Sequence, residues 1–473
     1  MLLRPSTVKP AQEVPASCPR IALLTPYDGG NLGDAAIQDS MIANLCERMP
    51  GLQLLGITLG CDNFLKRHGQ EAFPLLSASF SYELQGRAET RPDQTESESH
   101  PTASNRSVER GLRNLIRRAL SKVPGLMPVL KKARAVIDAA SRQILHSVEG
   151  YRVLRKQDLL IISGGGQLDD EWGGAWVHPF ALCKWTLLAR LAGVPCVMAS
   201  VGVGKISSRA SRRFISLALR MCRYRSYRET KTRAIAVSLL PRAANDSVVP
   251  DLAFSMPDSE LPLPGADIRS KACGRTVIAI SPIAFGKPGN WPTPDRALHD
   301  RYVQQMARLL SCLARRGYFV VILYSSLGDD ESVIPEIMGH LGEEIKHHVA
   351  GQIHFPAIKG WKDLVTALLD VDYLVASRLH STILGFVSRT PVVAISFDPK
   401  VDWVMEDLDQ TDYLLQIRDF ASEDVLSALD RMKVRRDAVI ERITSYRQSI
   451  LSASARQYDS LTRMALEHHQ SHN

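Results

Sequence analysis

The chain has 473 residues, a formal net charge of +8 and 45% hydrophobic residues. A chain of this length exceeds one typical domain and is expected to form two or three. The basic balance favours acidic partners: phosphorylated substrates, nucleic acid or an anionic membrane surface. The eight cysteines show no C-x-x-C pair and no zinc-type spacing, which predicts reduced core thiols and no metal site. Because the N-terminus lacks an apolar signal region and no long apolar run follows, we expect a cytoplasmic protein without a transmembrane helix.

The N-terminal half carries the signals of alternating strands and helices. After a flexible tail at residues 1–19, a first domain is predicted at 20–255. It opens with a strand at 20–25, a glycine-rich loop at 27–34 and an apolar-periodic helix at 35–48, the first unit of a doubly wound fold. The later elements expected are a strand at 158–163, a helix at 180–193, a strand at 195–201 and a strongly basic helix at 207–225.

Residues 87–148 are predicted to be an insertion in this domain. Residues 87–107 are polar and rich in Glu, Ser, Thr and Pro, which indicates disorder. Residues 108–148 alternate Leu, Ile and Val with Arg and Lys, which predicts one or two cationic amphipathic helices broken near Pro124 and Pro128. Such a segment either docks on an anionic membrane or packs on its own domain with its basic residues in water, and both alternatives stay open.

The C-terminal half repeats the α/β pattern. A linker at 256–274 precedes a second domain at 275–422, and a helical tail at 423–473 is expected to fold back onto the first half. Within the second domain we expect strands at 276–280, 318–324, 372–376 and 392–396 and helices at 302–316 and 361–369. The layout predicts an α/β fold with two doubly wound domains that face each other across a cleft.

The motif Ser377-Arg378-Leu379-His380 directly follows one predicted strand, and Lys400 follows the next. Open α/β sheets bind ligands at the carboxyl ends of their strands. Arg378 offers a bidentate fork for carboxylate or phosphate, His380 a proton near neutral pH, and Lys400 a point charge. This set suits a small, multiply anionic substrate whose reaction needs a proton. The alternatives are a core or capping histidine, an interdomain salt bridge for Arg378 and simple exposure for Lys400.

Two glycine-rich loops also end strands and should reach the same edge. Glycine lets a ligand or another chain segment come close, and a helix N-terminus attracts anions. Asp34, at the start of the first helix, is either a helix cap or a group that orients or deprotonates an acceptor hydroxyl. The alternative for the second loop, at residues 164–166, is a tight turn that binds no ligand. The loop residues expected near a ligand are Gly30, Asn31, Gly33, Gly164, Gly165 and Gly166.

Arg228 stands apart from the other arginines of the basic region. It follows an apparent short strand and precedes a new helix, a position that favours an anion ligand. The alternative is an ion pair with Glu229 or Asp251. The remaining arginines of the basic helix are interpreted as a solvated face.

In chain order these motifs resemble the polysaccharide pyruvyltransferases, over roughly residues 21–407 without the insertion. The matching motifs are Asn31-x-Gly33-Asp34, Gly164-Gly165-Gly166, Tyr227-Arg228-Glu229, Pro250-Asp251, Ser377-Arg378-Leu379-His380 and residues 391–400. The resemblance implies a GT-B-like fold of two Rossmann-type domains. It further implies phosphoenolpyruvate as donor, a sugar diol as acceptor, no separate cofactor, and a cyclic pyruvate ketal on a glycan or lipid-linked glycan as product.

The resemblance also assigns roles to residues. It implies that His380 protonates the methylene carbon of phosphoenolpyruvate, with Leu379 beside it in the donor-binding motif. The residue chemistry independently suits Arg378, Arg228 and Lys400 for neutralising the donor anions, and Asp34 is the weaker candidate for the acceptor. One departure from the family pattern is Phe397, where a tyrosine is expected.

Two rival functions remain. A GT-B glycosyltransferase would use the same cleft for a nucleotide sugar, but no glutamate stands near His380 to bind a donor ribose, which favours a smaller anion. A non-catalytic protein that binds anionic glycan or nucleic acid would explain the basic segments, yet few aromatic residues interleave with those arginines, so nucleic acid is not the expected partner. We therefore expect a role in exopolysaccharide or cell-surface glycan synthesis, with peripheral contact at the inner face of the plasma membrane.

Overall fold

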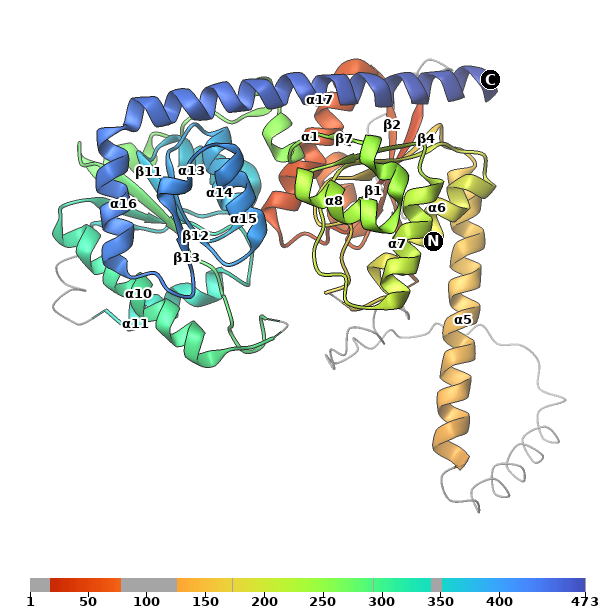
Figure 1. The fold of residues 1–473 in the computed structure, drawn as a ribbon, viewed down its shortest axis with the longest axis horizontal. Helices are drawn as coiled ribbons and strands as arrows, with labels where there is room; N and C mark the ends of the chain where they lie inside the picture. Colours follow the sequence, from red (N-terminus) through yellow and green to blue (C-terminus); the bar gives the residue numbers. More distant parts are fainter. Residues whose placement is uncertain (1–17, 78–125, 172, 292, 342–350, 473) are drawn as a thin grey trace, which may run out of the picture.

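The computed structural model describes residues 18–77, 126–171, 173–291, 293–341 and 351–472. Within these ranges the chain forms two parallel sheets, each accompanied by helices (Figure 1). Nearly all of the predicted N-terminal tail and the part of the predicted insertion between 87 and 125 lie outside the described residues.

The N-terminal sheet has seven parallel strands in the order β3-β2-β1-β4-β5-β6-β7. Its central strands β1 and β4 are apolar on both faces, as expected for a sheet covered by helices on each side. In β1, Ile21 and Leu23 pack with α1, whereas Ala22 and Leu24 pack with α6 and α7. The elements are β1 Arg20–Leu24, α1 Leu32–Arg48, β2 Gln53–Thr58, α2 Cys61–His68, β3 Glu71–Pro74, α5 Leu126–Leu154, β4 Leu159–Ser163, α6 His178–Leu191, β5 Cys196–Val201, α7 Arg209–Met221, β6 Tyr224–Tyr227, α8 Thr230–Leu239, η1 Pro241–Asn245, β7 Ser247–Val248, η2 Leu252–Ser255 and η3 Asp258–Glu260.

The C-terminal sheet has six parallel strands in the order β10-β9-β8-β11-β12-β13. The order reverses between β8 and β11, and such a switch point is where doubly wound sheets bind ligands. The elements are α9 Asp267–Ala272, β8 Val277–Ser281, α10 Arg296–Arg315, β9 Phe319–Ile322, η4 Glu331–Val333, α11 Ile334–Gly339, β10 Ile353–His354, α13 Trp361–Leu369, β11 Tyr373–Ala376, α14 Leu379–Val387, β12 Val392–Ser396, α15 Pro399–Asp407, η5 Thr411–Tyr413, β13 Leu414–Gln416, α16 Ser422–Val434 and α17 Arg436–His472.

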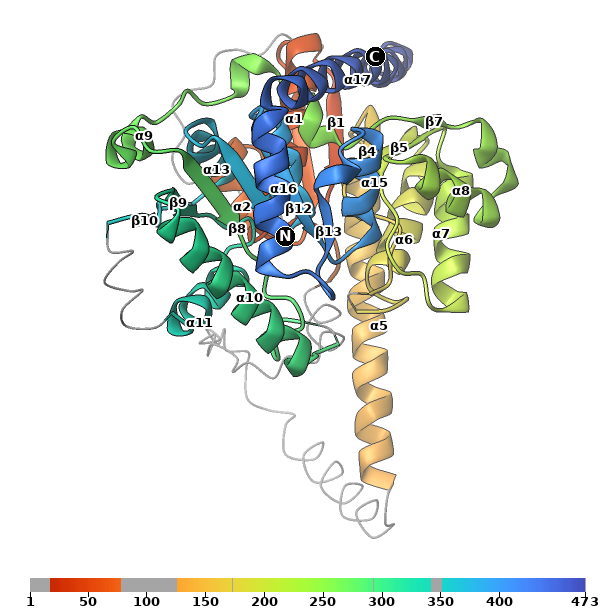
Figure 2. The ribbon, with the colours of Figure 1, turned by 60° about the vertical axis from the view of Figure 1, so that its left-hand side comes forward.

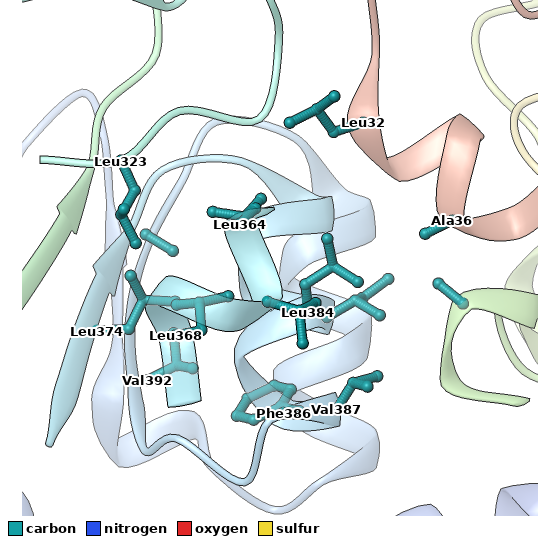
Figure 3. Packing of buried hydrophobic residues seen from close by; sticks show 14 of the residues in the cluster. Leu32, Ala36, Leu323, Leu364, Leu368, Leu374, Leu384, Phe386, Val387 and Val392 are labelled. Atoms are coloured by element: carbon teal, nitrogen blue, oxygen red, sulfur yellow. The ribbon is translucent and has the colours of Figure 1, made fainter. Parts of the chain in front are cut away.

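The two domains share one apolar core. Helix α1 of the first domain lies beside α13 and α14 of the second, and Figure 3 shows Leu32 and Ala36 on the side of α1 that faces them. The backbone also joins the domains at a short antiparallel bridge, where Leu32 N–H donates to Ser325 O at 2.9 Å and Leu327 N–H donates to Gly30 O at 2.9 Å. These contacts fix the relative position of the two sheet edges.

The C-terminal tail folds back as predicted. Helix α17 runs from the second domain across the first (Figure 1). Its Tyr458 hydroxyl lies 2.9 Å from Ser255 Oγ, and His469 Nδ1 lies 2.9 Å from Asp158 Oδ2 at the start of β4. The helix therefore ties the last residues of the chain to the first sheet.

Helix α5 corrects the prediction for the end of the insertion. It is one helix that passes through Pro128, since a proline in the first turn removes no helical hydrogen bond, so the predicted break at Pro128 is wrong. Its C-terminal half belongs to the first domain: Leu154 is buried, and a Cβ at Gly150 would lie 2.9 Å from the Trp185 ring. Its N-terminal half projects away from the body of the protein (Figures 1 and 2).

Capping explains other shifts from the predicted boundaries. Helix α1 begins at Leu32 because Asn31 caps it, and α10 begins at Arg296 because Asp295 Oδ1 accepts from Leu298 N–H at 3.1 Å. The predicted basic helix ends at Met221 and gives way to β6. Cys46 and Cys273 are exposed, so the prediction of core thiols is wrong for these two. Among the described residues, no helix combines the length and apolarity that crossing a bilayer would require.

Candidate active site

Charged side chains from both domains converge where the carboxyl ends of the two sheets meet. Asp34 comes from the first turn of α1, Arg228 follows β6, Asp251 precedes η2, and His380 lies in the first turn of α14. His380 Nε2 lies 3.9 Å from Asp251 Oδ2, and no described residue accepts or donates a hydrogen bond at this buried nitrogen. The structure thus brings together three of the residues singled out in the sequence, Asp34, Arg228 and His380, around Asp251.

The first glycine loop makes room for the histidine. A Cβ at Gly33 would lie 1.8 Å from His380 Cγ, so only glycine lets the ring lie against α1. Asn31 Oδ1 accepts from Gly33 N–H at 2.9 Å, which makes Asn31 the helix cap and leaves the Asp34 carboxylate out of that role. Gly30 contributes its carbonyl to the interdomain bridge. The capping alternative for Asp34 is therefore wrong, and substrate contact by Gly30 and Asn31 stays a prediction.

The three glycines after β4 differ in their surroundings. A Cβ at Gly164 would meet Ile37 at 2.9 Å, so this position serves close packing against α1. Gly165 has a positive φ of 75°, and a Cβ there would lie 3.3 Å from Asp34 Oδ1. Gly166 is exposed, and a Cβ at this position would have no atom of the described residues within 4 Å, apart from those of its chain neighbours. Only Gly165 is thus shown to lie directly beside a charged group of the site.

Arg228 is buried between two carboxylates. Its Nε donates to Glu229 and its Nη1 donates to Asp251 Oδ2 at 3.0 Å, while Nη2 is buried without a hydrogen-bond partner among the described residues. Gly202 accommodates the guanidinium, because a Cβ there would lie 2.9 Å from Arg228 Cζ. The ion pairs considered as an alternative are confirmed with both partners, and anion binding by Arg228 stays a prediction.

Arg378 is held by a carboxylate that the sequence reading missed. Asp330, which follows β9, is fully buried and receives Arg378 Nε at 2.8 Å and Nη2 at 2.7 Å. The guanidinium is thereby fixed in orientation while its side chain keeps 23% exposure. Asp330 lies eight residues beyond Ile322, the last residue of β9, so no motif next to a strand end marked it in the sequence.

Lys400 lies at the start of α15 with its Nζ 3.6 Å from Asp398 Oδ2. Across the domain boundary it interacts with Asp169, which follows the Gly164–Gly166 turn. Burial raises the pKa of the Asp169 carboxyl to about 6, and the Lys400 ammonium opposes that rise. A second missed carboxylate, Asp169, therefore interacts electrostatically with the predicted anion-binding lysine.

Burial also sets the protonation of the central pair. It raises the pKa of Asp34 above its usual range, with the His380 imidazolium as the main opposing influence. It lowers the pKa of His380 below its usual range, although the carboxylates of Asp251 and Asp34 act in the other direction. Burial thus moves the two pKa values toward each other, and such a pair of perturbed groups is typical of sites that perform general acid–base chemistry.

Two surface cavities of about 510 and 440 Å³ lie away from this cluster. The first is lined by Arg275, Thr276 and Tyr373, which precede or begin β8 and β11 and so stand at the opposite edge of the C-terminal sheet. The second is lined by residues around η5 and the start of α17. The candidate site is thus identified by its converging charged groups and not by an open volume.

Comparison with solved structures shows the fold class. The chain is 12% identical to the Anabaena protein Alr3699/HepE in complex with UDP, with a TM-score of 0.51 over 96% of this chain and 100% of that one. It is 12% identical to a UDP-glucose:anthocyanidin 3-O-glucosyltransferase in complex with UDP, with a TM-score of 0.51 over 94% and 98% of the two chains. Likeness at such identity concerns architecture alone, and it establishes a GT-B fold of two α/β domains.

A comparison with curated proteins found no match. The model of the polysaccharide pyruvyl transferase family, in contrast, matches residues 31–399. This range covers most of the chain and contains every site residue described above except Gly30 and Lys400, which lie just outside its two ends. The protein therefore belongs to the polysaccharide pyruvyl transferase family.

Proposed function

We propose that this protein transfers the pyruvyl group of phosphoenolpyruvate onto two hydroxyls of a sugar and forms a cyclic ketal during synthesis of an exopolysaccharide or cell-surface glycan. The observation that carries the proposal is the position of His380. Its buried Nε2 has no hydrogen-bond partner among the described residues, and it lies between a carboxylate at 3.9 Å and the arginines of the site.

The donor would be held by positive charge from the second domain. Phosphoenolpyruvate carries a carboxylate and a phosphate on a three-carbon frame, and the pre-oriented Arg378 together with Lys400 matches such a small anion. Arg228 adds positive charge from the first domain, although the carboxylates of Glu229 and Asp251 neutralise this charge. Fixed charges of this kind stabilise charge that develops during reaction.

His380 would donate its proton to the methylene carbon of the donor. The carbon bearing the phosphate then becomes an oxocarbenium centre, which one sugar hydroxyl attacks. Inorganic phosphate leaves as its C–O bond breaks, and the second hydroxyl closes the ketal and returns a proton to His380. Proton transfer by a positioned group contributes typically about 10²–10⁴-fold to the rate.

Asp34 would act on the acceptor. A carboxylate with a raised pKa is a stronger base than a free one, which suits it to take the hydroxyl proton. The neighbouring Gly165 leaves room beside this carboxylate, because a Cβ there would lie 3.3 Å from Asp34 Oδ1. The first domain would therefore bind the sugar and the second the donor.

The proposal is tested by the thermal stability of the purified protein with phosphoenolpyruvate, UDP, GDP or inorganic phosphate. A ligand at about 100 times its Kd adds roughly 2.7 kcal/mol to stability. We expect a shift with phosphoenolpyruvate that is lost in Arg378→Ala and kept in Arg296→Ala, an exposed arginine on α10. A shift with UDP or GDP and none with phosphoenolpyruvate would replace the proposal with a nucleotide-sugar glycosyltransferase, and no shift with any of them, together with glycan binding, would indicate a non-catalytic protein.

A further inference from the structure

Three neighbouring helices of the first domain expose an apolar surface. Helices α5, α6 and α7 pack side by side, α6 against both others, and cover one face of the N-terminal sheet. We call their outward side the outer helical face. Its exposed apolar side chains are Ile144, Leu145, Val148, Leu187, Leu191 and Leu217. Ile144, Leu145 and Leu191 are each about two-thirds exposed, and such a gathering on adjacent helices marks an interaction surface, unlike a single exposed leucine.

The same face is basic. Helices α6 and α7 contain no Asp or Glu, and the described C-terminal half of α5 has only Asp138 and Glu149. The exposed arginines on the three helices are Arg142, Arg152, Arg190, Arg209, Arg212, Arg213 and Arg220. Apolar side chains interleaved with arginines are the pattern by which helices bind the surface of a bilayer that contains anionic lipids. A partner protein of ordinary charge would not require so many cations.

The geometry of α5 relates this face to the active site. A crossover helix runs antiparallel to the strands that it connects, so α5 begins on the side of the carboxyl edge and ends at the amino end of β4. At about 1.5 Å per residue its 29 residues span about 43 Å, whereas the five-residue β4 spans about 17 Å. The helix therefore projects well beyond the sheet, on the side where the candidate site lies (Figures 1 and 2).

We propose that the outer helical face binds the surface of an anionic bilayer, with α5, α6 and α7 lying along the membrane. The carboxyl edge of the first domain then stands beside the lipid surface, and an acceptor sugar attached to a lipid can reach Asp34 without leaving the membrane. The lipid-linked acceptor rests on the proposed pyruvyl transfer, whereas the contact with the bilayer does not.

The experiment is co-sedimentation of the full chain with vesicles of phosphatidylcholine, with and without phosphatidylglycerol. We expect binding only with the anionic lipid and weaker binding at high salt. The variant Ile144→Ser/Leu145→Ser/Leu191→Ser should lower the partition coefficient about tenfold or more. The matched control Leu263→Ser/Val434→Ser removes two exposed apolar side chains outside this face and should bind as the wild type does.

A second variant tests charge without changing apolar contacts. Arg212→Glu/Arg213→Glu should also lose binding to the anionic vesicles, and both variants should keep the wild-type melting temperature because the altered side chains are exposed. Equal partition of all the proteins would overturn the proposal. So would a wild-type dimer in light scattering that the apolar variant converts to a monomer, because a second copy would then cover the face. Vesicle binding without any thermal shift by phosphoenolpyruvate would keep this inference and remove the proposed reaction.

Discussion

At residue scale, the missing side chain of Gly33 decides whether His380 can occupy the site. In Gly33→Ala the new Cβ would lie 1.8 Å from His380 Cγ, so the ring must leave its place between Asp34 and Asp251. We expect phosphate release from phosphoenolpyruvate, with glycan from the producing cells as acceptor, to fall about 10²–10⁴-fold. Gly339→Ala, at an exposed position of α11 where nothing lies within 4 Å, is the matched control and should stay active. Wild-type turnover in Gly33→Ala would remove His380 from the mechanism.

The lowered pKa of His380 predicts that binding of the donor causes the histidine to take up a proton from solvent. Burial keeps the imidazole neutral near pH 7 in the free protein, whereas a bound phosphate and carboxylate would raise its pKa. Binding of phosphoenolpyruvate should therefore take up a proton between pH 6.5 and 7.5. Calorimetry in buffers of different ionisation enthalpy measures this uptake, which should vanish in His380→Gln while binding persists. A binding heat that does not depend on the buffer would contradict the assigned role.

At the scale of the element, helix α17 contacts residues at the carboxyl ends of β5 and β6, beside the candidate site. Gln457 accepts from Ser226 Oγ, and its Nε2 donates to Ser200 Oγ at 3.1 Å. Ser200 has a positive φ of 53°, and its N–H donates to Ser226 Oγ at 2.7 Å, two residues before Arg228. These bonds hold the carboxyl ends of β5 and β6 in place.

Gln457→Ala should accordingly weaken the site from a distance. Leaving buried polar groups unpaired costs about 1–3 kcal/mol, which urea unfolding measures. We also expect the thermal shift by phosphoenolpyruvate to shrink at a fixed donor concentration, since Arg228 loses support. Gln448→Ala, exposed on the same helix, should change neither quantity. An unchanged stability in Gln457→Ala would mean that α17 only covers the sheet.

The sequence revealed the elements whose signals are local and missed those that depend on contacts across the fold. Apolar runs followed by glycine or Ser-Arg-x-His predicted the strands and the edge that carries Asp34 and His380. Nothing local shows that Asp330 orients Arg378 or that Gln457 supports β6, because these partners are 48 and 231 residues away from the groups they contact. The helix through Pro128 was missed because proline is a breaker only beyond the first turn.

At the scale of the whole molecule, three histidines make the first domain sensitive to acid. Burial is the largest cause that lowers the pKa of His68, His146 and His178, each to about 4. The unfolded chain binds these protons near pH 6.5 and the folded chain does not, so stability is lost as the pH falls from 7 toward 4. Asp169, with a pKa raised to about 6, and Asp34, whose pKa burial also raises, act in the opposite direction, but they are two groups against three. All three histidines lie in the first domain, so that domain should unfold first.

Urea unfolding at pH 7 and pH 5 measures this difference. Each fully buried histidine costs at most about 2 kcal/mol between these values, and solvent near His68 and His146 reduces their share. In His178→Gln, which keeps a polar side chain near Gln167, the loss of stability on acidification should be smaller by that amount. His472→Gln, exposed at the end of α17, should follow the wild type. If His178→Gln loses as much stability on acidification as the wild type does, the acid response comes from a group other than His178. Groups of the second domain would then be the next to test, because α17 couples the two domains.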